Sequence, residues 1–63
     1  MKRKLLGYTL EYTTKNIWGQ CGTTRQHFDR MTEVEDVIDE LEEKDVEIIS
    51  IFLTTNEEIV LDN

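Results

Sequence analysis

Residues 32 to 44 read TEVEDVIDELEEK, and this stretch decides the fold of the chain. Its apolar residues Val34, Val37, Ile38 and Leu41 recur at the spacing that lines one face of a helix. All the remaining positions from 33 to 43 carry carboxylates: Glu33, Glu35, Asp36, Asp39, Glu40, Glu42 and Glu43. The stretch therefore predicts an amphipathic helix with an acidic outer face.

The ends of this helix carry local signals of unequal strength. Thr32 followed three residues later by Glu35 forms a capping-box pattern, which predicts that the helix begins at Thr32. Lys44 is a favourable cation for the last turn, but no glycine follows to end the helix.

Two extended segments precede the helix. Residues 5 to 14, LLGYTLEYTT, alternate so that Leu6, Tyr8, Leu10 and Tyr12 share one side, which predicts a half-buried strand. A turn at residues 15 and 16 leads into a second extended segment that runs to about residue 28. Two glycines leave residues 19 to 24 open between strand and loop.

The segment after the helix, VEIISIFLTT at residues 46 to 55, is rich in β-branched and aromatic residues. Alternation places Ile49, Ile51 and Leu53 on one face. The opposite face receives Val46, Ile48 and Phe52. Apolar side chains on both faces predict a central strand that is covered twice. A turn at residues 54 to 57 and a short strand at residues 58 to 61 are expected to follow.

Together these segments predict an α+β fold of ββαββ order in one small domain, residues 1 to 63. The sheet should be mostly antiparallel, with three to four strands and one amphipathic helix on one face. One helix leaves the other side of such a sheet open, so we expect a homodimer. The residues expected at the dimer interface are Ile48, Phe52, Tyr8 and Tyr12.

Composition limits the class of protein further. A chain of 63 residues removes only about 60% of its unfolded surface from water on folding, so a partner subunit is the expected source of extra stability. A single cysteine, no signal-peptide core and no membrane-spanning run predict a cytoplasmic protein. The net charge is −7, divided into +4 for residues 1 to 28 and −11 for the remainder.

Residues suited to catalysis or metal binding do not converge in the sequence. Cys21 and His27 match no zinc spacing, and a regular strand would hold them about 20 Å apart. We expect Cys21 to be a small buried side chain and His27 to be a polar residue at an edge or on the surface. The sequence therefore predicts no enzyme, no metal and no cofactor.

The acidic helix is the strongest functional signal. Seven charges over residues 33 to 43 give one charge per roughly 2.4 Å of helix, between the spacings of single-stranded and duplex DNA phosphates. Like charges at positions four apart repel, so the chain is expected to gain from them by attracting a basic partner. The residues expected to contact this partner are Glu33, Asp36, Asp39, Glu40, Glu43 and Glu47.

In size and charge layout the chain is similar to small phage-encoded inhibitors that imitate DNA. The resemblance implies an interaction protein that occupies the basic surface of a nucleic-acid-binding protein, in the host cytoplasm if phage-encoded. No motif of that class matches residue by residue, so the resemblance assigns no residues.

Other interpretations remain open. The basic, aromatic first hairpin could form a nucleic-acid-binding or regulatory module, with Arg25, Lys15, Tyr12 and Trp18 as contacts. The hydrophobic face could serve a structural assembly subunit. The acidic helix could also be a solvated face that only keeps the protein soluble.

Overall fold

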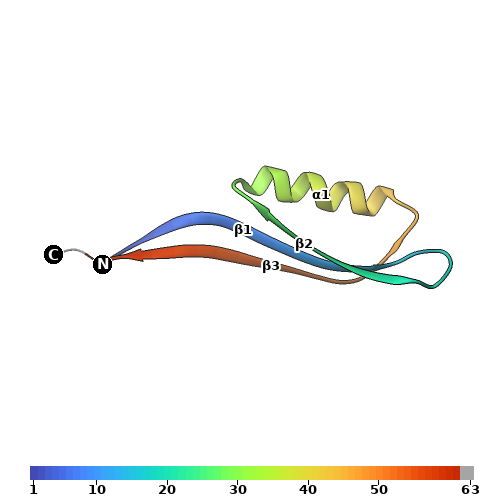
Figure 1. Cartoon of the computed structure of the whole chain (residues 1–63). Helices are drawn as coiled ribbons and strands as arrows, with labels where there is room; N and C mark the ends of the chain where they lie inside the picture. The colour runs from blue at the N-terminus through green and yellow to red at the C-terminus, as the bar shows by residue number, and fades with distance from the viewer. Residues whose placement is uncertain (62–63) are drawn as a thin grey trace.

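A computed structural model describes residues 1 to 61 as a three-stranded sheet with one helix beside it (Figure 1). The elements follow the order β1 (Lys2–Lys15), β2 (Cys21–Phe28), α1 (Met31–Glu43) and β3 (Glu47–Val60). The sheet has the order β2-β1-β3, and both strand pairs are antiparallel. The expected α+β class, with an antiparallel sheet and one helix, is confirmed.

The first hairpin is closed by a tight turn over residues 16 to 20. The side-chain Oδ1 of Asn16 accepts hydrogen bonds from the backbone N–H groups of Trp18, at 3.0 Å, and Gln20, at 2.9 Å. Gly19 has a φ of +82°, a left-handed conformation that glycine adopts without steric cost. The strand then resumes at Cys21, which places residues 19 and 20 in the turn and residues 21 to 24 in β2.

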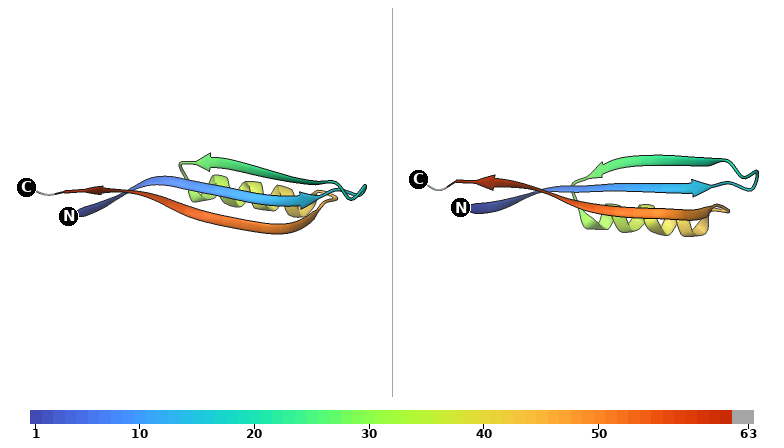
Figure 2. Two further views of the ribbon diagram at one scale, coloured as in Figure 1. Left: turned by 60° about the horizontal axis from the view of Figure 1, so that its bottom comes forward. Right: turned by 90° about the horizontal axis from the view of Figure 1, so that it is seen from below.

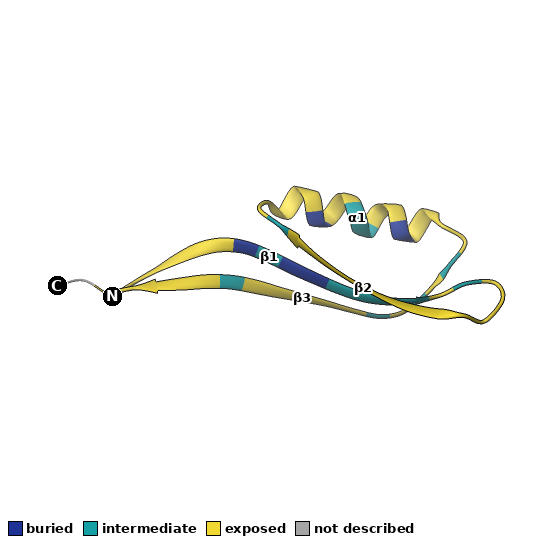
Figure 3. Cartoon of the chain, viewed as in Figure 1, coloured by how far each residue is buried: buried dark blue, intermediate teal, exposed yellow. Residues whose placement is uncertain are grey.

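The core lies between α1 and the middle of the sheet (Figure 3). Leu10 of β1 and Val34 of α1 have no exposed surface, and Leu41 is 4% exposed. The strand registers place Tyr8 and Tyr12 on the same face as Leu10, because alternate residues of a strand share a face. We call this face, which α1 covers, the helix face, and the other side the open face.

The sheet continues as a two-stranded arm beyond the helix and β2. β2 pairs with residues 8 to 15 of β1, whereas β3 pairs with β1 from residue 2 to residue 15. The arm, residues 2 to 7 with residues 56 to 60, extends beyond α1 and has the N-terminus near its tip (Figure 2). It gives the molecule extents of 57 × 19 × 11 Å and a radius of gyration of 15.2 Å. A compact chain of this length would have a radius near 10.6 Å.

The expected turn at residues 54 to 57 and the separate last strand are wrong, because β3 runs without a break from Glu47 to Val60. Asn56 favours a turn when its side chain bonds to its own backbone. Here its Nδ2 instead donates to Thr9 Oγ1 at 2.8 Å, across to the neighbouring strand. The irregularity at this point is a bulge in the opposite strand, between Leu5 and Gly7.

The expected central position of this segment is also wrong: β3 is an edge strand, and β1 is central. A second bulge explains the apolar residues that alternation assigned to opposite faces. Thr13 pairs with Ser50 and Thr14 pairs with Ile48, so the ladder skips Ile49. Ile48 therefore lies on the helix face. A β-bulge, and not covering of the strand on both faces, explains why alternation assigned these apolar residues to opposite faces.

The capping box is likewise not formed. The helix begins at Met31, its N-cap is Arg30, and no side chain caps it. Two residues separate β2 from α1, and this short connection sets the helix start one residue before Thr32. At the other end Lys44 is the C-cap, and its backbone N–H donates to the carbonyl of Glu40 at 3.1 Å.

Candidate functional site

The outer surface of α1 is a continuous acidic face. All seven carboxylates between positions 33 and 43 are exposed, and the buried Val34 and Leu41 point the opposite side of the helix toward the sheet. At about 100° per residue, Asp36, Asp39 and Glu43 lie furthest from the core. We call the exposed set the acidic face: Glu33, Glu35, Asp36, Asp39, Glu40, Glu42 and Glu43.

Within residues 1 to 61, no ion pair joins a carboxylate of the acidic face to a lysine or arginine. The ion pair recorded in this part of the chain is that of Arg3 with Glu57, at 4.0 Å, in the arm. Carboxylates one turn apart, such as Asp36 and Glu40, therefore repel without compensation. Among the described residues, the acidic face thus has no paired cation.

Glu47 lies apart from the other predicted contact residues. It is the first residue of β3 and pairs with Lys15 of β1 in the strand register. An exposed cross-strand neighbour of opposite sign offsets part of its charge. The structure thus brings Glu33, Asp36, Asp39, Glu40 and Glu43 together on α1 and places Glu47 at the adjoining end of the sheet.

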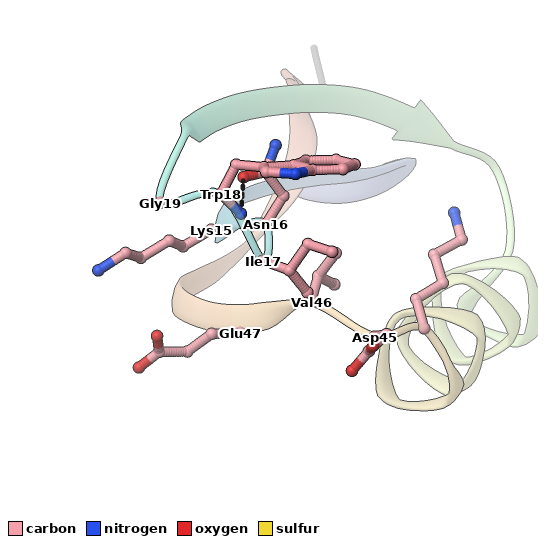
Figure 4. A pocket seen from close by; sticks show the side chains of 9 residues that line it. Lys15, Asn16, Ile17, Trp18, Gly19, Asp45, Val46 and Glu47 are labelled. Atoms are coloured by element: carbon pink, nitrogen blue, oxygen red, sulfur yellow. Dashed lines mark hydrogen bonds between the residues drawn. The ribbon is translucent and has the colours of Figure 1, made fainter.

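A hollow of about 630 Å³ that the sequence did not reveal opens at this end of the sheet (Figure 4). The β1–β2 turn borders it with Ile17 and Trp18, and the α1–β3 loop borders it with Val46. Ile17 is 69% exposed and Trp18 is 78% exposed. Charges of both signs complete the lining: Lys15, Lys44, Asp45 and Glu47. An apolar pair in a turn was the available signal, but its partner Val46 is brought there by the tertiary fold.

The four residues predicted for a dimer interface do not share one face. Tyr8, Tyr12 and Ile48 are half-buried and lie on the helix face. Phe52 pairs with Glu11, so it lies on the open face, where 63% of its surface is exposed. A face-to-face contact could use Phe52 or the other three residues, but not all four together.

The contacts proposed for a nucleic-acid module are also divided. Arg25 pairs with Glu11 on the open face, which places an acidic side chain directly beside it. Tyr12 is half-buried on the helix face, whereas Lys15 and Trp18 lie at the hollow. These four side chains do not form a single stacking surface.

Cys21 is exposed, so the expectation that it is buried is wrong. It lies at the start of an edge strand, next to the turn, where no other element covers it. His27 is exposed on the same strand, as expected, and its Nδ1 lies 2.8 Å from Thr9 Oγ1. Residues 1 to 61 contain no group of three or more histidine, cysteine or acidic side chains arranged to hold a metal ion.

Over the described part of the chain, α1 is too short and too polar to cross a membrane. Comparisons with protein-family models, curated proteins and solved structures find no match to this chain.

Proposed function

We propose that this protein binds a basic, nucleic-acid-binding protein through the acidic face and inhibits it by occupying its nucleic-acid-binding surface. The observation that carries this proposal is the exposure of seven carboxylates on α1 with no cation paired to them within residues 1 to 61. The proposal makes the acidic face a substitute for a run of phosphates.

The dimensions of α1 suit this role. Its 13 residues give a rod about 20 Å long and about 10 Å wide with side chains. A protein groove that accepts a phosphate backbone presents lysine and arginine at comparable intervals. The acidic face offers such a groove one charge per roughly 2.4 Å of rod.

The charge pattern also favours binding over simple solubility. A helix that only needs solubility can interleave lysine with glutamate, which gains a few tenths of a kcal/mol per pair. Positions 33 to 43 contain no lysine or arginine, so this chain accepts repulsion instead. Concentrated negative charge raises the association rate with a basic partner, and salt reduces this effect steeply.

The direct test is competition. A panel of basic DNA-binding proteins is mixed with a fluorescent DNA duplex, and displacement of the duplex by this protein is measured from low to physiological and high salt. We expect displacement that weakens steeply as salt rises. Affinity that does not change with salt, or a mobility shift of nucleic acid by this protein alone, would contradict the proposal.

A charge-matched pair of variants separates the acidic face from the overall charge. The first combines Asp36→Asn, Glu40→Gln and Glu43→Gln on α1. The second neutralises three carboxylates elsewhere: Glu11→Gln, Asp29→Asn and Glu58→Gln. Each variant raises the net charge from −7 to −4. We expect the first to lose at least tenfold in affinity and the second to lose much less.

The same variants report whether the fold is retained. Removing the repulsion at positions 36, 40 and 43 should stabilise α1 by about a few tenths of a kcal/mol per pair, so weaker binding would not reflect unfolding. Equal losses of affinity in the two variants would show that net charge, and not the acidic face, determines binding.

A further inference from the structure

The two edges of the sheet differ sharply in chemistry. The β2 edge is eight residues long and carries Arg25 and His27. The β3 edge is fourteen residues long, and its residues 48 to 55, IISIFLTT, contain no charge and no proline. Charges, prolines and short length are the usual features that keep an edge strand from pairing with another chain. The β3 edge is long, and it has neither charge nor proline over these eight residues.

Large apolar side chains remain exposed along this stretch. Ile51 and Leu53 are on the helix face, yet 40% and 44% of their surfaces are exposed, because α1 does not cover the outer edge of β3. The bulge residue Ile49 is 51% exposed, and Phe52 on the open face is 63% exposed. Figure 3 shows most of β3 as exposed along its length.

The amount of exposed surface matches what one subunit contributes to a dimer. The chain has 5158 Å² of accessible surface, whereas a compact monomer of 7.5 kDa would have about 4,250 Å². The excess of about 900 Å² is close to the roughly 800 Å² that each partner buries in a standard interface.

We propose that the β3 edge pairs antiparallel with the β3 edge of a second copy of this chain, which joins two sheets into one six-stranded sheet. A two-fold axis perpendicular to the sheet relates the copies, so each residue must face a residue on the same face. This requirement excludes registers in which a residue of the helix face opposes one of the open face.

The bulge at Ile49 determines how the remaining registers pair. With an axis at Ile51, Ile51 lies opposite its own counterpart and, past the bulge, Ile48 lies opposite Leu53 of the other copy, so apolar residues of the helix face meet one another. With an axis at Phe52, Ile48 would lie opposite Thr55 of the other copy, which leaves fewer apolar pairs on the helix face. We therefore place the axis at Ile51.

The dimer also covers the apolar side chains of β3 that α1 leaves exposed, Ile51 and Leu53. The two copies of Ile51 meet on the helix face, and the two helices flank them on that face. Each arm runs past the start of the other copy's β3, toward the end of the sheet where Trp18 and Val46 lie. This interface differs from the predicted contact between sheet faces, because main-chain pairing of β3 forms its centre.

Thr24 supplies a matched control for Ile51, because Tyr12 pairs with Thr24 on β2 and with Ile51 on β3. Thr24 and Ile51 therefore occupy equivalent positions, on the same face, at the two edges of the sheet. Light scattering should give the native chain a mass of about 15 kDa, twice 7.5 kDa. The Thr24→Lys variant should have the same mass as the native chain. Ile51→Lys, which sets two cations together on the axis, should shift the mass to that of one chain.

Disulfide trapping tests the register without disrupting the edge. In a Cys21→Ser background, Ile51→Cys should form a covalent dimer on mild oxidation, because opposed residues have Cβ atoms about 4.5 to 5.5 Å apart. Thr24→Cys in the same background should stay monomeric on a non-reducing gel. A native chain that is monomeric at micromolar concentration, an Ile51→Lys variant that remains dimeric, or preferential cross-linking of Thr24→Cys would each overturn the proposal.

Discussion

The strand β1 passes through two environments, and their contrast explains most of the molecule. From residue 8 to residue 15 it has a strand on each side and α1 above it, and there Leu10 is completely buried. From residue 2 to residue 6 it has β3 alone as a neighbour, and there Leu5 and Leu6 are 50% and 52% exposed. Similar residues in one strand thus differ in burial because their neighbours differ.

This contrast predicts where stability resides. Burial of apolar surface is the main favourable term in folding, so the covered part of β1 should hold the fold together and the arm should add little. A three-stranded sheet with a helix can be stable by itself, whereas a two-stranded ribbon in water is marginal at best. The arm depends on its continuity with the covered part or on a second chain.

The largest expected effect comes from truncating Leu10. Leu10→Ala removes a fully buried side chain, which should cost about 2 to 5 kcal/mol of unfolding free energy. The matched change Leu6→Ala in the arm should cost less than about 1 kcal/mol, as expected for a half-exposed site. Urea denaturation followed by circular dichroism, at one fixed protein concentration, measures both. Similar costs would show that the arm is packed as tightly as the core.

The junction between the two environments depends on Gly7. Its φ of +146° disfavours any other residue, and a Cβ there would lie 2.5 Å from the carbonyl oxygen of Phe28. Gly7→Ala should therefore destabilise the fold by about 1 to 3 kcal/mol. Gly22 of β2 is the control, because a Cβ there meets nothing within 4 Å. Gly22→Ala should stabilise by about 0.4 to 1 kcal/mol, and opposite signs in the same denaturation assay would confirm the constraint at Gly7.

The helix and its acidic face were predictable from the sequence because a helix is a local structure. The 3.6-residue period identified Val34 and Leu41 as the buried side and placed Asp36, Asp39 and Glu43 opposite them. The first strand was predictable for the same reason, since alternation around Leu10 depends on neighbouring residues. Five of the six residues predicted for partner binding consequently lie together on α1.

The position of each strand in the sheet was not predictable, because it depends on pairing between distant segments. β1 pairs with both other strands, so the apolar β3 becomes an edge and not the centre. A bulge at Ile49 changes which residues share a face, and no local pattern announces it. The hollow beside Trp18 and the exposure of Cys21 likewise follow from which segments meet at the end of the sheet.

The smallest expected effect concerns the polar contacts that join the three strands at the junction. Thr9 is 5% exposed, and its Oγ1 contacts His27 Nδ1 on β2 and accepts from Asn56 Nδ2 on β3, each at 2.8 Å. Thr9→Val keeps the shape and removes both contacts, which should cost about 1 kcal/mol. The control is Thr13→Val, where the lost bond to Thr23 is exposed to water and its removal should change stability by less than about 0.5 kcal/mol.

The contact between Thr9 and Asn56 lies at the boundary between the covered part and the arm. Asn56 is paired with Gly7 where the arm meets the covered part, so its contact with Thr9 ties β3 to the covered part at that point. If Thr9→Val weakens this tie, backbone amides of residues 56 to 60 should exchange with deuterium faster while those near Leu10 keep their protection. Equal acceleration along the whole of β3 would mean that the arm and the covered part unfold as one unit.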